Sequence, residues 1–564
     1  MSKTVRTLPS HRRPVAALAL WTLALAAGLP QPAGAQAVPK AGSTTLEPAP
    51  PLRPPVSAPV TPASPAGSPA ETPGPSFVLR RVRFVGATVF SDAELQTLAA
   101  AQLGKAVTLA DLEAIAQRAA ERYRAAGYLL AQALVPAQDV TSGDVEISLL
   151  EGRLGRVQIE VDPAAPIGEA QVRAIVNRLP AGKPLQQTLL NRVLLLLSDL
   201  PGVRAEAALE IGEAAGSTDL IVNVSPSRRW DLAFDADNHG SRSTAEYRVG
   251  LQGRWNSPLR AGDNLDYRLQ LGSGGHLSFG RVGYERPLGG DGLRFGVAAS
   301  TLEYALGGDF AALDASGRAD VVEAGLTYAL TRSRTRNLFA KLLLQRKLLE
   351  DRFGAAIGTS RNKRMSGASF ALSYENSDTL LGGGYTSAGV TLLAGELDLD
   401  AEGRANDARR TAGGFSHINY NLSRLHAIGP KTHLYLGLAG QIADKNLDSV
   451  EKVSLGGPRG VRAYAPSEIT ADEGHILNAE LRYSPTPELS LQGFYDWGWA
   501  RRNKLPDPAL DTDNKVRLRG FGVGAFWGAQ DGFTLRASLA WRDSRVGEID
   551  QRNPRLYLQL SKPL

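Results

Sequence analysis

The C-terminal part of the chain, residues 229–564, alternates apolar and polar residues in one short segment after another. In "NLDYRLQLG", Leu265 and Leu269 fall on one face of an extended strand, whereas Asp266 and Arg268 fall on the other. About sixteen such segments occur, with about 21 residues for each strand and its connection, which suits membrane strands joined by alternately short and long loops. The apolar face needs either a second sheet or lipid to cover it. The pattern favours a transmembrane β-barrel of about 16 antiparallel strands over a soluble sandwich.

The first 35 residues have the order of a secretory signal peptide. Basic residues up to Arg13 precede an apolar run from Pro14 to Leu29, and "AGA" follows at 33–35. A membrane anchor is the alternative, but the run is shorter than the roughly 20 residues that a spanning helix needs. Because no later apolar run is long enough to span as a helix either, we expect the mature chain to cross the outer membrane with strands.

Composition narrows the possible functions further. The chain has no cysteine, and its seven histidines are scattered without a metal-binding spacing. The formal charge is +6, but basic and acidic residues are interleaved, whereas nucleic-acid binding needs clustered positive charge. Neither a nucleophile elbow nor a phosphate-binding glycine loop is present. We therefore expect no enzyme, no metal, no cofactor and no nucleic-acid partner.

Three further segments precede the alternating region. Residues 36–76 are rich in proline, which fixes φ and lacks an amide donor, so they are predicted to form a linker. Residues 77–152 predict a strand, two helices and two strands, the first of these last two within 128–143 and followed by a Ser-Gly turn, and residues 153–228 repeat that order. Two copies of one arrangement predict two small repeated modules.

A glycine- and proline-containing loop, "GGPRGVRAYAPSE" at 456–468, interrupts the predicted strands. Counting from residue 229, it falls between about the eleventh and twelfth strands, on the side opposite to the chain's entry. The thirteenth strand contains "GFYDWGW" at 493–499. Its alternation places Leu491, Tyr495 and Trp497 on the lipid-facing side, so Asp496 is predicted to point into the barrel.

Several motifs, in a fixed order, resemble one family. The two modules look like POTRA domains, and residues 127–157 are similar to the signature region of the TpsB family of two-partner secretion transporters, the hemolysin secretion and activation proteins. "VRAY" resembles the family's VRGY motif in the sixth extracellular loop, with Ala463 in place of glycine. "FYDWG" matches its F-x-D-x-G barrel motif.

The resemblance implies that the loop folds back into the barrel and that Arg462 forms a salt bridge with Asp496. Its motif neighbours are Val461, Tyr464, Phe494 and Gly498. Water in the lumen would bring the strength of such a pair toward the roughly 1 kcal/mol of exposed ion pairs. Family members often carry an N-terminal helix that plugs the pore, and whether one exists here stays open.

The function implied by the resemblance is that of an outer-membrane translocator. Its periplasmic modules would recognise an unfolded partner exoprotein, and Gln132, Leu134 and Gln138 in the signature region are candidate partner-binding residues. The barrel, surrounded by outer-membrane lipid and expected to be monomeric, would thread the partner to the cell surface. The alternatives are an insertase of the same superfamily, which usually carries more modules, and a diffusion porin, which needs none.

Overall fold

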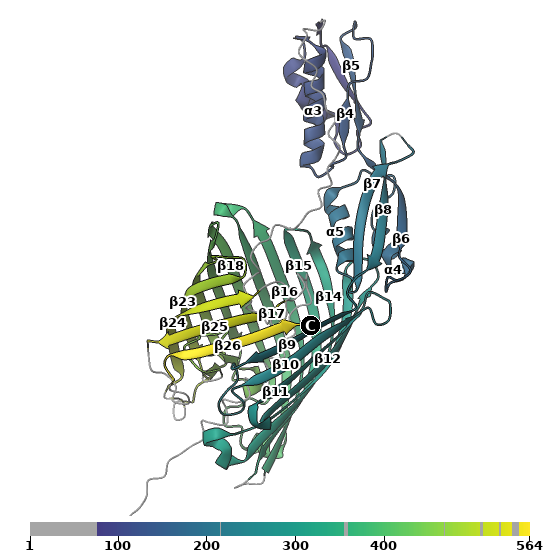
Figure 1. Cartoon of the computed structure of the whole chain (residues 1–564). Coiled ribbons are helices and arrows are strands. Elements are labelled where there is room, and N and C mark those ends of the chain that lie inside the picture. Colours follow the sequence, from purple (N-terminus) through teal and green to yellow (C-terminus); the bar gives the residue numbers. More distant parts are fainter. Residues whose placement is uncertain are drawn as a thin grey trace, which may run out of the picture.

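The computed structural model describes residues 76–564, except 215, 355–358, 467–468, 508–510, 512, 529–531 and 544–551. The expected signal peptide and the proline-rich segment up to residue 75 lie outside the described residues. Two α/β modules precede a closed barrel along the chain (Figure 1). In the part of the chain that the structure describes, no helix has the length and apolar character needed to cross a membrane.

The first module packs two helices against a three-stranded sheet of order β2-β5-β4. Its elements are β1 (Phe77–Val78), β2 (Arg81–Val85), α2 (Asp92–Ala99), β3 (Ala106–Val107), α3 (Leu109–Ala125), β4 (Gln132–Leu134) and β5 (Asp144–Leu150). Ser91 and Glu94 form a capping box at the start of α2. Apolar side chains spaced for one helix face bury themselves against the sheet, among them Leu95, Leu112 and Ile115.

The second module repeats this arrangement with sheet order β6-β8-β7. Its elements are β6 (Arg153–Val161), α4 (Glu169–Val176), α5 (Gln187–Ser198), β7 (Val203–Ile211) and β8 (Ser217–Pro226). Its core includes Leu196 and Leu197 from α5, and Ala329 and Phe339 from the barrel belong to the same buried cluster. The second module is therefore packed directly on the barrel, as Figure 1 also shows.

The barrel closes through sixteen antiparallel strands, which confirms the predicted fold class. They are β9 (Trp230–Asp237), β10 (Arg248–Asn256), β11 (Asn264–Gly272), β12 (Leu277–Leu288), β13 (Leu293–Ala305), β14 (Ala315–Arg332), β15 (Arg336–Phe353), β16 (Thr359–Asp378), β17 (Gly384–Leu399), β18 (Gly413–Gly429), β19 (Thr432–Ala443), β22 (Glu473–Tyr483), β23 (Leu489–Arg501), β24 (Lys515–Gly528), β25 (Thr534–Arg542) and β26 (Arg555–Pro563). A short helix, α6 (Ala401–Ala405), lies between β17 and β18. The closing pair, β26 with β9, spans only the five register positions from Gln559↔Asp237 to Pro563↔Ala233.

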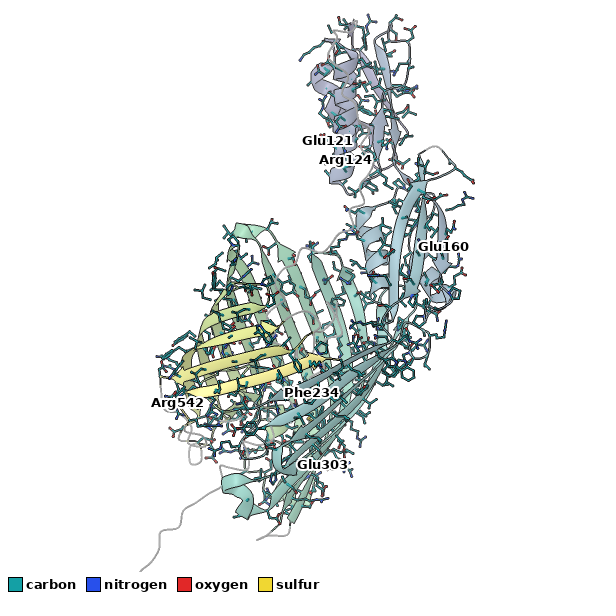
Figure 2. The ribbon with its side chains drawn as sticks, viewed as in Figure 1. Glu121, Arg124, Glu160, Phe234, Glu303 and Arg542 are labelled. Carbon is teal, nitrogen blue, oxygen red and sulfur yellow. The ribbon has the colours of Figure 1, made fainter. Side chains whose placement is uncertain are left out.

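The strands alternate between an exposed outer face and a more buried inner face. Tyr495 and Phe521 are neighbours on the outside and are 44% and 49% exposed, whereas Asp496 is 0% exposed on the inside. Short turns join the strands beside the second module, and longer connections join them at the other end. Figure 2 labels Glu303 and Arg542 at that far end of the barrel and Glu160 on the second module.

Candidate functional site: a loop folded into the barrel

The longest connection of the barrel, residues 444–472 between β19 and β22, folds into the barrel interior. Its two arms pair through β20 (Val453–Ser454) and β21 (Thr470–Ala471). Leu455, Val461 and Tyr464 are completely buried, in one cluster with inward-facing side chains of β23, β24 and β25. The loop thus has its own hydrophobic core against one side of the barrel, which holds it by packing as well as by charge.

Arg462 and Asp496 form a buried ion pair, which we call the loop lock. The guanidinium donates from Nε to Asp496 Oδ2 at 2.8 Å and from Nη2 to Oδ1 at 2.7 Å, and the Arg462 backbone N–H donates to Oδ2 at 3.0 Å. Arg462 is 6% exposed and Asp496 is 0% exposed. Two parallel N–H···O bonds fix the orientation of both groups. Because the pair is buried, the expectation of a water-weakened contact is wrong.

Three further side chains surround the loop lock. Arg462 Nη1 lies 2.8 Å from Glu480 Oε1, and the guanidinium carbon lies 3.5 Å from the centre of the Phe494 ring. Asn478 donates to Asp496 Oδ1 at 2.7 Å and to the Gly460 carbonyl at 3.1 Å. The arginine is therefore held by two carboxylates and an aromatic face, which compensates its burial. Glu480 and Asn478 were not among the residues expected from the sequence, although the alternation of β22 places both on the inner face.

The other motif residues shape the contact between loop and barrel. A Cβ on Gly498 would lie 2.9 Å from Val461 Cγ2, so the absence of a side chain there lets the loop approach β23. Tyr464 is buried, and its carbonyl accepts a hydrogen bond from the Tyr557 hydroxyl at 2.9 Å. Tyr557 belongs to β26, so the loop also contacts the last strand of the barrel.

A second group of ion pairs holds the start of the loop against the opposite strands. Lys347 Nζ on β15 lies 2.6 Å from Glu451 Oε1, and His417 Nε2 on β18 lies 3.0 Å from Glu451 Oε2. Lys363 Nζ on β16 lies 2.9 Å from Asp448 Oδ2. We call these five residues the entry cluster. No sequence pattern pointed to it, because its two carboxylates on the loop lie at least 31 residues along the chain from the cations of β15, β16 and β18.

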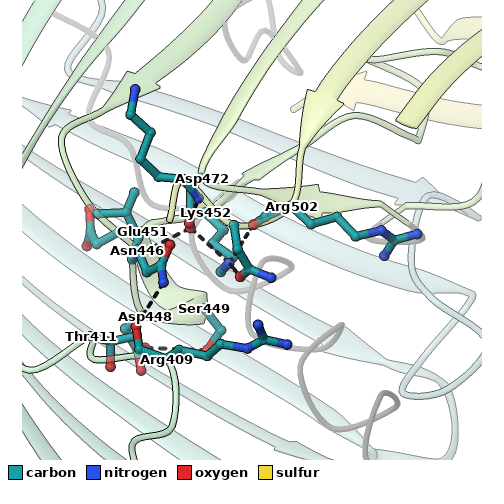
Figure 3. A network of polar contacts seen from close by, with 12 residues as sticks. Arg409, Thr411, Asn446, Asp448, Ser449, Glu451, Lys452, Asp472 and Arg502 are labelled. Atoms are coloured by element: carbon teal, nitrogen blue, oxygen red, sulfur yellow. Dashed lines mark hydrogen bonds and ion pairs between the residues drawn. The ribbon is translucent and has the colours of Figure 1, made fainter. Parts of the chain in front are cut away.

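Burial alone would raise the pKa of Glu451, but the neighbouring Lys347 and His417 lower it below its ordinary value. Glu451 is therefore a carboxylate in the folded chain. Close by, Lys452 Nζ lies 2.8 Å from Asp472 Oδ1 and so joins the two ends of the loop. Figure 3 shows Glu451, Lys452 and Asp472 within this network of polar contacts.

The three candidate partner-binding residues lie on the first module, far from the loop lock. Gln132 and Leu134 lie on β4 at the edge of the sheet, and Leu134 is 51% exposed. Gln138 instead uses its amide inside the module. It donates to the Glu146 carbonyl at 2.7 Å and accepts from the Glu146 N–H at 2.7 Å, so it continues the pairing of β5 beyond the end of β4.

The arrangement is suited to holding a segment in place. The loop lock and the entry cluster are ion pairs between a loop and the barrel, and neither pairs a nucleophile with a base as acyl or phosphoryl transfer requires. Among the residues that the structure describes, no group of three or more metal-ligating side chains could hold a metal ion.

Comparison with known proteins finds similar chains among outer-membrane transporters. The chain is 29% identical over 447 residues to the heme/hemopexin transporter protein HuxB of Haemophilus influenzae, covering 78% of each chain. It is 21% identical over 482 residues to the outer membrane transporter CdiB of Escherichia coli, covering 82% of this chain and 77% of that one. The solved structure of CdiB from Escherichia coli matches with a TM-score of 0.68 at 18% identity, over 90% of this chain and 93% of that one, which shows a shared fold.

Two family models match the chain itself. The model of the ShlB-type POTRA domain matches residues 77–152. The model described as haemolysin secretion/activation protein ShlB/FhaC/HecB matches residues 216–527, more than half of the 564 residues. The chain therefore belongs to the haemolysin secretion/activation protein family ShlB/FhaC/HecB, the outer-membrane transporters whose POTRA domains lie in the periplasm.

Proposed function

We propose that this chain captures an unfolded partner exoprotein in the periplasm with its two modules and threads it through the barrel to the cell surface. The observation that carries the proposal is the attachment of two α/β modules to a closed sixteen-strand barrel whose interior holds a loop. Barrels of about sixteen strands can enclose an aqueous channel. Such a channel suits an extended chain. No nucleotide site is needed, because folding of the partner outside can supply the direction.

Capture requires backbone groups that a guest strand can pair with. In the second module, β6 and β7 are the two outer strands of the sheet, and each is nine residues long. An extended segment can add to such an edge through main-chain hydrogen bonds, while adjacent apolar side chains select its sequence. In the first module β2 and β4 are the two outer strands, and Gln132 and Leu134 on β4 would contact the guest.

The loop lock would decide which state of the pore is populated. While Arg462 is paired with Asp496, the loop occupies part of the interior along β23 to β25. Passage of a polypeptide would require the loop to shift or to leave. A buried ion pair between the loop and the barrel suits this role, because breaking it exposes two charges that must find new partners.

The remaining features fit a monomer surrounded by outer-membrane lipid. The barrel closes on itself within one chain, and its outer face carries exposed apolar residues such as Leu477 and Tyr495. The two rival functions are less well supported. A diffusion porin has no use for two periplasmic modules, and an insertase usually has more of them.

Deleting residues 77–151 tests the capture role. The first module has its own buried core, so its removal should leave the barrel folded and inserted while secretion of the partner exoprotein is lost. Trimming residues 38–65 of the linker is the control and should leave secretion intact. Export at the full rate by the deletion variant would disprove capture by the first module, whereas loss of export on trimming would reveal a plug or docking element in the linker.

A point substitution tests the β4 edge more finely. Leu134→Asp should reduce secretion several-fold without unfolding the module, because the side chain is 51% exposed and has little packing to lose. Leu129→Asp changes a leucine of the same module that is 50% exposed but lies outside β4, and should have little effect. Equal secretion by the two variants would remove β4 from the proposed contact.

A further inference from the structure

The outer face of β24 carries three cations in a row. Lys515, Arg517 and Arg519 are all exposed, whereas the residues between them, Val516 and Leu518, are buried against the loop. Because successive side chains of a strand point to opposite faces, the three cations point away from the barrel interior. They are spread over about 13 Å of strand.

These cations lie at the end of the barrel remote from the modules. Their strand begins there, and its Gly520 pairs with Arg542, which Figure 2 labels at that end. Moving along β24 toward the modules, the outward positions become apolar at Phe521 and Val523. The change from apolar to cationic side chains marks the upper limit of the lipid-facing band, at the level of the outer-leaflet headgroups.

Aromatic side chains of the neighbouring strand flank the cations. Trp499 is the register partner of Arg517, and Trp497 is that of Arg519. Tryptophan at this depth is typical of the boundary between hydrocarbon and headgroups in membrane barrels. The combination places positive charge next to anchoring rings at the membrane surface.

In the part of the chain that the structure describes, the three cations also form no ion pair, unlike Arg318 and Arg352 at the same end of the barrel. On β14 and β15, Arg318 is paired with Glu303 at 2.9 Å, and Arg352 with Glu350 at 2.7 Å. Within the described part of the chain, Lys515, Arg517 and Arg519 form no ion pair. Positive charge outside ion pairs at a membrane surface attracts anionic lipid headgroups.

We propose that the outer face of β24 binds the phosphorylated headgroup of an outer-leaflet glycolipid through Lys515, Arg517 and Arg519. The guanidinium groups match phosphate oxygens in geometry and charge. The acyl chains of the lipid would lie along the apolar outer positions of β23 and β24. The site is independent of the transported partner, and it lies on the strand whose inner face contacts the loop.

The test compares two matched double variants of the full chain, purified in a neutral detergent and titrated with lipid A. The β24 variant, Arg517→Gln with Arg519→Gln, should weaken lipid A binding about tenfold or more, because cations near an anionic lipid each contribute to affinity. Arg318→Gln with Arg352→Gln removes the same charge from paired positions and should leave binding unchanged. Equal affinity of wild type and the β24 variant would overturn the proposal.

Two further measurements identify the ligand and control for folding. Lipid A stripped of its phosphates should bind wild type as weakly as intact lipid A binds the β24 variant, and inorganic phosphate should not compete at equal concentration. Undiminished binding of the stripped lipid, or equal competition by phosphate, would contradict a lipid headgroup site. If the β24 variant fails to show the heat-modifiable migration of a folded barrel, Arg517→Lys with Arg519→Lys must retain most of the binding and lose it at high salt.

Discussion

At the scale of single residues, Ala463 illustrates how the loop and the barrel fit each other. The resemblance to the family places a glycine at this position, but the backbone at Ala463 is not left-handed and tolerates a side chain. A Cβ on Gly520 of β24 would lie 2.5 Å from the Ala463 Cβ. The methyl group of Ala463 therefore fits because Gly520, which faces it on the barrel, has no side chain. The alternation of the strands predicted the inward direction of Asp496, but it gave no means of predicting such a pair.

Glu151, at the end of the first module, gives a prediction on pH. Burial would raise the pKa of this carboxyl, but hydrogen bonds outweigh it and lower the pKa. The donors include the Thr88 side chain, the N–H groups of Thr88 and Val89, and the Tyr123 hydroxyl at 2.8 Å. A lowered pKa favours the charged, folded form. The stabilisation of the folded module by the Glu151 carboxylate is thus complete above the ordinary Glu pKa of about 4.3. It is lost as the pH falls through the lower pKa that Glu151 has in the folded module.

The measurement is the urea midpoint of the first module within the full chain, followed by a dye on Glu121→Cys, since the chain has no other cysteine. In the wild type the midpoint should fall as the pH drops below about 4.3. Glu151→Gln should lower the midpoint at neutral pH and flatten this dependence. An unchanged pH profile in Glu151→Gln would show that another group controls the acid sensitivity.

At the scale of elements, the sequence predicted the order of helices and strands in both modules but overestimated one strand. Residues 128–143 read as a strand, whereas β4 covers only Gln132–Leu134. Pro136 lacks an amide donor, and the Gln138 side chain takes over the pairing with β5. When a side chain takes the place of backbone hydrogen bonds in this way, the sequence keeps no alternating pattern that marks it, so the early end of β4 could not be predicted. The entry cluster was missed for a related reason, since its contacts join elements that are distant in sequence.

The entry cluster predicts that Glu451→Gln releases the start of the loop. Removing one partner of a buried ion pair costs about 3–5 kcal/mol, and here Lys347 would be left with its side chain only 4% exposed. Because this cost falls on the contact between the loop and the barrel, the variant should still give a folded barrel, with a larger conductance in planar bilayers and faster proteolysis within residues 444–454. Glu402→Gln alters a partly exposed pair with Arg361 at 3.7 Å and serves as the control. Equal conductance of both variants would mean that the cluster does not hold the loop.

At the scale of the whole molecule, the barrel of sixteen strands was predictable because the alternation repeats in every strand, and the structure confirms it. The way in which the second module packs on the barrel could not be predicted from the sequence. Arg332 on β14 donates two bonds of 2.8 Å to Asp199, and Arg192 on α5 donates to the Ala329 carbonyl at 2.8 Å. These contacts depend on the curvature of the barrel and on short turns at its rim, which no local pattern encodes.

Asp199→Ala should therefore loosen the second module on the barrel. Spin labels on Glu160→Cys and Glu303→Cys, both exposed, report the distance between the module and the far end of the barrel. The distance distribution should widen in Asp199→Ala. It should stay narrow in Glu169→Ala, which breaks an exposed ion pair with Arg173 inside the module. A narrow distribution in both variants would show that apolar packing alone fixes the joint.

The central claim is that the loop lock controls passage through the barrel. The most direct test is secretion of the partner exoprotein by wild type, Arg462→Ala, Asp496→Ala and the double variant, at matched levels of inserted barrel. Each single variant should reduce secretion strongly, because the loop lock is proposed to decide which state of the pore is populated, and an unlocked loop would no longer start from the position seen in the structure. The double variant should be little worse than either, because both substitutions remove the same contact. Arg352→Ala, on the outer face, controls for the loss of an arginine. Additive losses in the double variant would contradict the account, because they would show that Arg462 and Asp496 act separately.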